Sequence, residues 1–205
     1  MSTVTTVLFD LGGVLIDWNP DYLFAEIIPD DTERRFFLTE ICSPAWNHEM
    51  DAGRSVPESV AALAVEHPDH ADLIGIWWDR WPEMLGGPIP GTVDLAHGMS
   101  EAGIPLYALT NWAAETWPHA VARFDFLTTL FDGIVVSGHE GIAKPDPAIF
   151  ELVIDRFDLD PHTTLFIDDV EANIAAADRA GFVTHRFTSP GALNRALASH
   201  GLPAR

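Results

Sequence analysis

The chain of 205 residues contains a single cysteine, Cys42, and few basic side chains. One cysteine cannot form an internal disulfide, so we expect Cys42 to be a small buried apolar side chain in a protein of a reducing compartment. Eleven Lys and Arg face 31 Asp and Glu, which gives a net charge of −20. Such a chain repels nucleic acids and anionic membrane surfaces. We therefore expect neither as a partner, and a bound anion needs locally concentrated positive charge.

Long apolar runs, internal repeats and low-complexity tracts are also missing from the sequence. No apolar stretch approaches the roughly 18 residues that a membrane-spanning helix needs. The first residues lack the basic and apolar pattern of a signal peptide. We therefore expect a cytoplasmic protein. The length fits one domain, or a core domain with a smaller insertion, and the sequence leaves the oligomeric state open.

The sequence does contain a regular alternation of strand and helix patterns. Residues 3–9 form a β-branched and aromatic run that ends at Asp10, before Gly12 and Gly13, which is typical of a buried strand followed by a tight turn. Further strands are predicted at residues 104–110, 133–138, 163–169 and 183–187, and helices at 92–102, 114–124, 146–157, 171–180 and 189–198. This order predicts an α/β protein: a Rossmann-like three-layer core around a five-stranded parallel sheet.

Residues 19–87 differ from the rest, because helix patterns rich in Trp and acidic residues follow one another there without a strand. Helices are predicted at residues 30–41, 56–67 and 72–85. The segment GGPIPG, residues 86–91, is typical of a boundary loop. The sequence therefore predicts a catalytic core of residues 1–18 and 88–205, with a helical cap of residues 19–87 inserted after the first strand.

Polar residues lie at the carboxyl ends of three predicted strands. Asp10 follows the first strand, Thr110 and Asn111 follow the second, and the pair Asp168–Asp169 follows the fourth. The functional groups of parallel sheets gather beyond these ends. A single Asp at a strand end is usually only a turn or capping residue. The prediction therefore depends on polar residues occurring at three strand ends together. This arrangement predicts one functional site at this edge of the sheet.

Four short motifs occur in order along the chain: LFDLGGVL (8–15), ALTNW (108–112), GIAKPDP (141–147) and LFIDDVEAN (165–173). Together they resemble the haloacid dehalogenase superfamily, which consists mostly of phosphatases. The resemblance implies that Asp10 is a nucleophile that forms an acyl-phosphate. It implies that Mg²⁺ is held by Asp10, the backbone carbonyl of Gly12 and Asp168, with Asp169 and Asn173 nearby.

The same resemblance assigns the groups that hold the phosphoryl oxygens. The Thr110 hydroxyl and the Asn111 backbone N–H would bind these oxygens. Lys144 would supply a positive charge for the phosphoryl group and for Asp10. The expected partner is a small phosphorylated metabolite.

The chain departs from the pattern of most phosphatases of this superfamily at Gly12, where they carry a second Asp that protonates the leaving group. Three interpretations stay open. The first is a phosphatase for esters with good leaving groups, similar to a subgroup that includes sugar-1-phosphate phosphatases. The second is a metal-independent 2-haloacid dehalogenase, which needs no such acid. The third is a non-catalytic phosphate-ligand binding or regulatory module.

Aromatic residues near these motifs are candidates for substrate contact. Trp112 directly follows the Thr–Asn pair, and Trp18 lies where the chain enters the insertion, so both are expected to face substrate. Trp77, Trp78 and Trp81 lie at helical spacing, which favours packing inside the insertion over a sugar-stacking surface. Arg54 lies in a predicted loop, where a surface ion pair is favoured over substrate contact.

Overall fold

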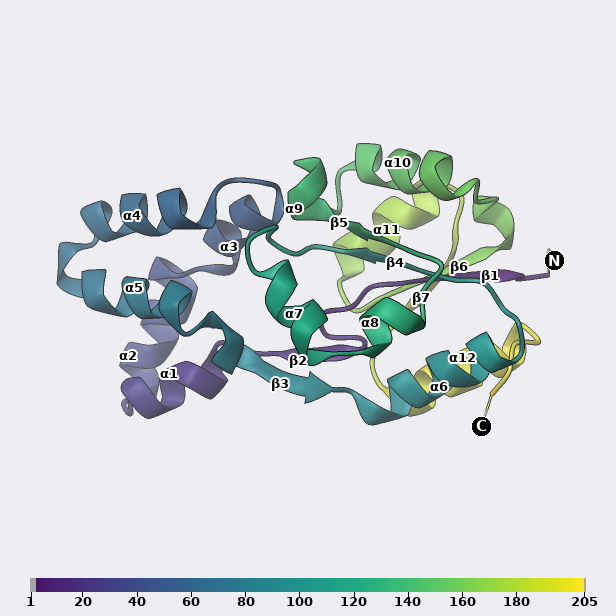
Figure 1. Ribbon diagram of the computed structural model, residues 1–205, viewed down its shortest axis with the longest axis horizontal. Helices are drawn as coiled ribbons and strands as arrows, with labels where there is room; N and C mark the ends of the chain where they lie inside the picture. Colours follow the sequence, from purple (N-terminus) through teal and green to yellow (C-terminus); the bar gives the residue numbers. More distant parts are fainter. Residues whose placement is uncertain (1–2, 205) are drawn as a thin grey trace.

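The structure is a computed structural model that describes residues 3–204. Its centre is a five-stranded parallel sheet in the order β5-β4-β1-β6-β7 (Figure 1). The strands are β1 (Thr6–Phe9), β4 (Leu106–Thr110), β5 (Gly133–Val136), β6 (Thr164–Asp168) and β7 (Val183–Arg186). The predicted sheet is confirmed, and each strand is a few residues shorter than predicted. Residues 1, 2 and 205 of the predicted core lie outside the described residues.

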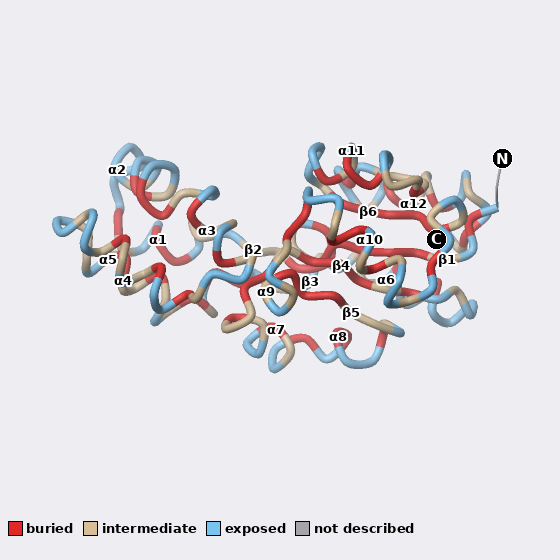
Figure 2. Tube along the Cα trace, turned by 90° about the horizontal axis from the view of Figure 1, so that it is seen from above, coloured by how far each residue is buried: buried red, intermediate tan, exposed pale blue. Residues whose placement is uncertain are grey.

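Helices cover both faces of the sheet and make the three layers. Alternate side chains of a strand point to opposite faces. Leu8, Leu109 and Phe166 pack with α10 (Pro147–Phe157) and α11 (Glu171–Arg179) on one face. Phe9, Ala108 and Ile167 face the other side, with α6 (Pro90–Glu101) and α12 (Pro190–Ser199). The three central strands β4, β1 and β6 are therefore largely buried on both faces, as the red segments of Figure 2 show.

Short helices follow β4 and β5, and their sequences explain where they begin. They are α7 (Trp117–Arg123), α8 (Phe126–Thr129) and α9 (Ser137–Glu140). Pro118 lies in the first turn of α7, where its missing N–H is tolerated. Asp146 caps α10, as expected, and accepts a hydrogen bond of 2.9 Å from the Ala148 N–H.

The insertion is joined to the core by two strands that the sequence did not predict. β2 (Ile16–Trp18) pairs antiparallel with β3 (Leu85–Pro88). The prediction of a loop from residue 86 was therefore wrong, because pairing with β2 outweighs the weak strand preference of Gly86 and Gly87. The two strands carry the chain from the sheet to the insertion and back (Figure 1).

Helices of the insertion lie together beyond the sheet (Figure 1). They are α1 (Asp21–Ile27), α2 (Asp31–Phe36) with a π-helical turn at Phe37–Ile41, α3 (Pro44–Asp51), α4 (Val56–Glu66), and α5 (Ala71–Asp79), with 3₁₀ turns at Pro68–His70 and Trp81–Met84. The sequence did not predict α1 or α3. Cys42 is buried, as expected, and burial raises the pKa of its thiol to about 12.

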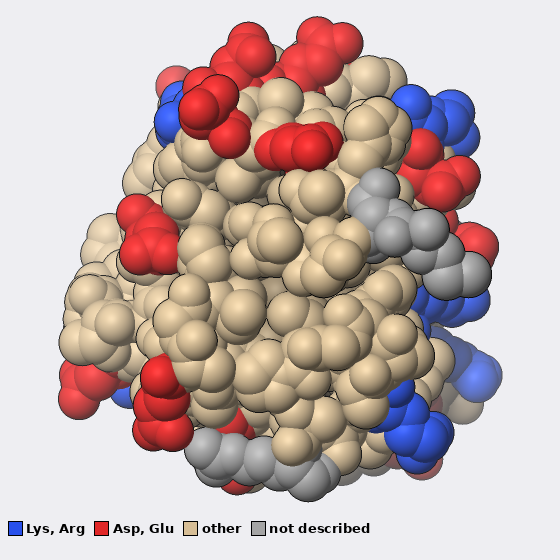
Figure 3. Space-filling model, turned by 90° about the vertical axis from the view of Figure 1, so that its right-hand side faces the viewer, with Lys and Arg blue, Asp and Glu red and all other residues tan. Residues whose placement is uncertain are grey.

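Charged side chains lie along the edge of the face seen in Figure 3, which is the end of the molecule opposite the insertion. Both acidic and basic side chains stand along this edge, and uncharged residues fill the centre. Within residues 3–204, no helix is long and apolar enough to cross a membrane.

Candidate active site

Three charged side chains meet at the carboxyl edge of the sheet. β1 and β6 are neighbours with Phe9 opposite Ile167, so Asp10 and Asp168 lie side by side beyond them. The ammonium group of Lys144 lies 3.0 Å from Asp10 Oδ1 and 2.7 Å from Asp168 Oδ2. It also donates to the backbone carbonyl of Leu109 at 2.9 Å. The Lys144 side chain is fully buried, so its charge acts with little screening by water.

Lys144 is positioned by Asn111. The side-chain amide of Asn111 accepts from the Lys144 N–H at 2.9 Å and donates to the Lys144 carbonyl at 2.8 Å. These two bonds tie the loop after α9 to the end of β4. The Asn111 side chain is therefore engaged with protein backbone, which is compatible with the expected role of its backbone N–H.

Asp168 is the most completely paired carboxylate of the site. It accepts from the Val170 N–H at 2.8 Å and from the Asn173 amide at 3.0 Å, in addition to Lys144. Burial acts to raise the pKa of Asp168, but Lys144 and these hydrogen bonds outweigh it and hold the pKa below its ordinary value. Asp168 is therefore an anion at neutral pH. Asn173, which was expected nearby, makes direct contact with it.

Asp10 and Asp169 are in a different electrostatic state. Burial raises the pKa of Asp10 well above its ordinary value, and the charges of Asp168 and Asp169 add to the shift against the opposing effect of Lys144. Burial and the charge of Asp168 likewise raise the pKa of Asp169. Carboxylate oxygens of Asp10, Asp168 and Asp169 lie within 4.8 Å of one another. Three hard oxygen ligands that repel each other fit a divalent cation, which would relieve the repulsion and favour ionised Asp10.

Thr110 and the glycine turn complete the edge of the site. Thr110 Oγ1 is buried without a hydrogen-bond partner, so it is available for a ligand oxygen. Gly13 adopts φ 71°, and a Cβ atom there would lie 2.7 Å from Asp169 Oδ2. Glycine is required at this position for both reasons. Gly12 has neither restriction, because a Cβ atom there would meet nothing within 4 Å.

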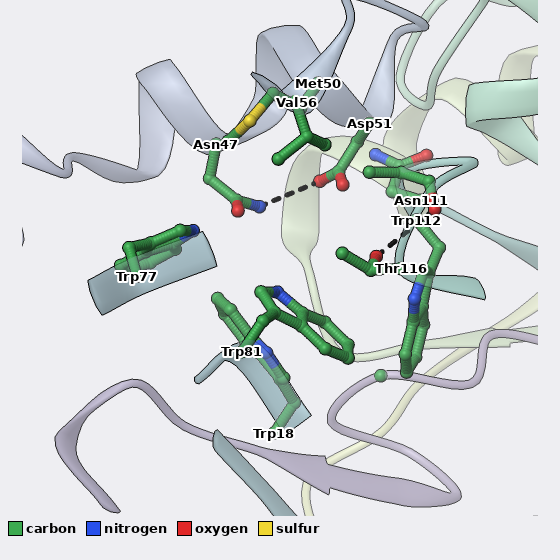
Figure 4. A pocket seen from close by; sticks show the side chains of 12 residues that line it. Trp18, Asn47, Met50, Asp51, Val56, Trp77, Trp81, Asn111, Trp112 and Thr116 are labelled. Atoms are coloured by element: carbon green, nitrogen blue, oxygen red, sulfur yellow. Dashed lines mark hydrogen bonds between the residues drawn. The ribbon is translucent and has the colours of Figure 1, made fainter. Parts of the chain in front are cut away.

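A pocket of about 100 Å³ opens beside this edge, between the core and the insertion. It is lined by Gly12, Trp18, Asn47, Met50, Asp51, Val56, Trp77, Trp81, Asn111, Trp112, Ala113 and Thr116. Figure 4 shows four tryptophan rings around the open space, with Asn47 and Asp51 facing it from α3. Trp18 and Trp112 thus lie where substrate contact was expected. Trp77 and Trp81 are buried, as the packing interpretation requires, and also form part of the wall.

Asp51 is a candidate functional residue that the sequence did not reveal. Its side chain accepts from the Asn47 amide at 3.1 Å, and its carbonyl accepts from the Ser137 hydroxyl at 2.6 Å. Burial raises the pKa of its carboxyl to about 7, against hydrogen bonding by the Ala113 N–H and the charge of Lys144. The signal in the sequence is faint: Asn47 and Asp51 lie four residues apart on the helix that also buries Trp46 and Met50.

Arg54 and Trp78 lie outside the pocket wall. Arg54 pairs with Glu49, and both side chains are about half exposed. The favoured interpretation of a surface ion pair for Arg54 is therefore confirmed. Trp78 packs against the core of the insertion.

Comparison with known proteins agrees with this geometry. The family model of haloacid dehalogenase-like hydrolases matches residues 4–181. The chain belongs to this family. A sesquiterpene phosphatase of Aspergillus oryzae is 28% identical over 183 residues, which are 89% of each chain.

Solved structures of haloacid dehalogenase-like proteins share the fold. A family enzyme of Bacteroides thetaiotaomicron, in complex with magnesium and inorganic phosphate, superposes with a TM-score of 0.67 at 23% identity, covering 91% of this chain and 95% of that one. L-2-haloacid dehalogenase of Xanthobacter autotrophicus, with chloropropionic acid covalently bound, gives 0.64 at 20% identity, covering 98% and 84%. The fold is therefore common to enzymes of both chemistries, and the choice between them depends on the site.

Proposed function

We propose that the protein is a Mg²⁺-dependent phosphatase that hydrolyses a small phosphorylated metabolite through an aspartyl-phosphate on Asp10. One observation carries the proposal: the buried Lys144 joins Asp10 to Asp168, while Asp169 brings a third carboxylate within 4.8 Å. This is a site for a cation and an anion together. The similarity to the sesquiterpene phosphatase of Aspergillus oryzae supports the same chemistry. So does the structural similarity to the Bacteroides thetaiotaomicron enzyme that contains magnesium and phosphate.

Asp10, Asp168 and the Gly12 carbonyl would hold the metal, with Asp169 beside them. When bound, Mg²⁺ neutralises the repulsion between carboxylate and phosphoryl oxygens and orients the phosphoryl group. The Thr110 hydroxyl, the Asn111 N–H and the Lys144 ammonium group would bind the phosphoryl oxygens and stabilise the charge that develops on them.

The reaction then proceeds in two steps. In the first, a carboxylate oxygen of Asp10 attacks phosphorus, the ester P–O bond breaks, and the leaving oxygen takes a proton. In the second, water attacks the phosphorus of the aspartyl-phosphate, gives up a proton, and regenerates Asp10 as phosphate departs. Splitting hydrolysis in this way replaces one very slow step by two easier ones.

We assign the proton transfers to Asp51. Gly12 has no side chain to carry out this role, and Asp51 is the one ionisable residue among the described residues that line the pocket. Its hydrogen-bond partners at Asn47 and Ala113 are both donors, so a proton on the carboxyl is free to be given to the pocket. Its pKa of about 7 suits an acid in the first step and a base in the second.

The insertion would act as a cap that closes over substrate. In the structure it is joined to the core by hydrogen bonds from the Val56 N–H to Glu115 at 3.0 Å and from the Ser137 hydroxyl to the Asp51 carbonyl. Closure would exclude water and bring Asp51 to the reacting group.

The residues that line the pocket do not suit the substrate of a 2-haloacid dehalogenase. A 2-haloacid carries a carboxylate, and no Lys or Arg is among the described residues that line the pocket. That carboxylate would also lie close to the carboxyl group of Asp51 and to the three carboxyl groups at the sheet edge, those of Asp10, Asp168 and Asp169. The non-catalytic alternative does not explain why Lys144, Asp10 and Asp168 are held in contact with one another inside the protein.

The test is phosphate release from p-nitrophenyl phosphate with Mg²⁺, with and without a chelator. We expect turnover that requires the metal, because the carboxylates and the phosphate cannot gather without neutralisation. Halide release from 2-chloropropionate in the presence of chelator would instead establish a dehalogenase. A folded protein that binds phosphate and Mg²⁺ but turns over neither compound would support the binding module.

A further inference from the structure

The pocket between core and insertion has an apolar wall. Its largest members are the rings of Trp18, Trp77, Trp81 and Trp112, to which Met50 and Val56 add aliphatic surface (Figure 4). The rings support each other edge to face: Trp18 on Trp77 at 6.2 Å and Trp81 on Trp112 at 5.6 Å between centroids. A wall of this kind favours a hydrocarbon or ring over a polyhydroxylated chain.

Three of these rings carry polar groups without a partner. The indole N–H groups of Trp18, Trp77 and Trp112 are buried and make no hydrogen bond within the protein. An indole N–H can only donate, so each needs an acceptor atom. Buried donors are rarely left unpaired, and an unpaired donor at a binding site indicates a ligand acceptor or water.

The charge of the residues that line the pocket restricts the class of ligand further. The single ionisable residue in the wall is Asp51, and the described lining residues include neither Lys nor Arg. A second phosphate or a carboxylate on the substrate would therefore be buried without a cation, beside a carboxyl group. The group that enters the pocket therefore carries no negative charge, and the apolar wall favours an uncharged group.

From these observations we infer that the substrate is the phosphate monoester of a neutral, largely apolar organic group that bears oxygen acceptors for the indole N–H groups. This rests on the phosphatase function proposed above. The ester phosphate would lie at Asp10 and Lys144, and the organic group would fill the pocket between Trp18, Trp77 and Trp112.

Matched primary alkyl phosphates test the apolar character. We expect kcat/KM for cyclohexylmethyl phosphate to exceed that for glycerol 3-phosphate by at least ~10-fold, because several CH₂ groups leave water in the pocket. Glycerol is the better leaving group, so leaving-group chemistry cannot produce this order. Phosphoglycolate, which carries a carboxylate, should be slower than either. Equal rates for the three esters would overturn the inference.

A ketone oxygen on the ring of the ester tests whether the indole N–H groups bind an acceptor atom of the substrate. The 4-oxo derivative of cyclohexylmethyl phosphate should have the lower KM, and Trp18→Phe or Trp112→Phe should remove that advantage, about 5- to 10-fold for one lost hydrogen bond. In these variants the KM of the plain hydrocarbon ester should rise less than that of the keto ester, because it loses packing area but no hydrogen bond. Trp78→Phe is the matched control, since Trp78 lies on α5 but outside the wall, and it should change neither value. An unchanged KM for the keto ester in both Trp variants would show that water satisfies the indoles.

The experiments distinguish a wrong substrate class from a wrong proposed function. If p-nitrophenyl phosphate is hydrolysed but the apolar esters show no preference, the phosphatase stands and the substrate class is wrong. If no ester is hydrolysed, the pocket is tested directly with the alcohol 4-(hydroxymethyl)cyclohexanone, read by tryptophan fluorescence. Saturable quenching that is weaker in Trp18→Phe would support the pocket, and no change would overturn it.

Discussion

The edge of the sheet and the pocket beside it differ in how completely their polar groups are paired. At the edge, Lys144 makes three contacts and Asp168 accepts from three residues, so each group holds the next in place. In the pocket, three indole N–H groups have no partner, and Asp51 is the one ionisable residue in the wall. Charged side chains that hold one another in place suit a reaction that is the same for every substrate. A pocket with unpaired donors suits recognition of one particular organic group.

The largest effect is expected from removing the nucleophile. Asp10→Asn keeps the shape of the side chain but removes its negative charge, so phosphatase activity should fall by at least ~10³-fold while the fold is retained. Asp155→Asn, on the exposed side of α10, is the control and should be fully active. Release of p-nitrophenol and circular dichroism measure the two quantities. Near-normal activity in Asp10→Asn would end the covalent mechanism.

The pairing at the sheet edge is tested by Lys144→Met. Removing a fully buried cation leaves Asp10 and Asp168 facing each other, which should lower the free energy of unfolding by about 3–5 kcal/mol at pH 7 without metal. Added Mg²⁺ should restore part of the loss, since it supplies positive charge to the same carboxylates. Urea unfolding with and without Mg²⁺ gives both values. A variant as stable as wild type without metal would mean that Lys144 does not hold the two carboxylates together.

The carboxylates of the sheet edge were predictable because they lie at strand ends. A strand pattern shows where Asp10 and Asp168 fall, and the rule for parallel sheets places both at one edge. Lys144 lies in a loop and Asn173 on helix α11, so both were expected only from the resemblance to the haloacid dehalogenase superfamily. The roles of these residues in catalysis stay predictions.

The pocket was not predictable to the same degree, because it depends on tertiary contacts. β3 forms from Leu-Gly-Gly-Pro only because β2 lies beside it. Asp51 occupies an ordinary position at the end of a helix, and no local pattern shows that core residues Ala113 and Ser137 bury it. The unpaired state of the three indole N–H groups depends on which residues surround them in the folded chain, and no local pattern shows this.

Asp51→Asn tests the half-buried carboxyl of the pocket. Burial raises the pKa of Asp51 from an ordinary 3.8 to about 7, so the folded chain binds this proton more tightly than the unfolded chain. The stabilising contribution is therefore complete below about pH 4 and is lost as the pH rises to about 7. Asn cannot ionise, so the variant should gain about 2–4 kcal/mol over wild type at pH 8 and little at pH 4, at about 1.4 kcal/mol per pKa unit.

Unfolding by urea at the two pH values measures this gain, and the exposed Asp69→Asn in the same insertion should show none.

The same Asp51 variant should slow hydrolysis of alkyl phosphates more than of p-nitrophenyl phosphate, whose leaving group needs no proton. Equal slowing of both substrates would show that Asp51 is not the proton donor.

The smallest effect is expected from adding an acid at the sheet edge. Gly12→Asp has room, since nothing lies within 4 Å of the new Cβ and the backbone is outside the left-handed region. Asp51 already supplies the proton in the proposed mechanism, so the variant should leave the slope of log rate against leaving-group pKa nearly unchanged. The absolute rate should fall modestly, because a further carboxylate joins an acidic site. A flatter slope in the variant than in the wild type would show that Asp51 does not donate the proton efficiently.

If Asp10 is the nucleophile, it becomes covalently phosphorylated during turnover, and mass spectrometry of the trapped enzyme detects this. The Mg²⁺-loaded protein is mixed with excess p-nitrophenyl phosphate, quenched in acid within the first turnover, digested, and analysed by peptide mass spectrometry. The account predicts a phosphoryl group on the peptide that contains Asp10, which hydroxylamine removes, and none in Asp10→Asn. Turnover without any phosphorylated peptide, or with the phosphoryl group on a different residue, would contradict it.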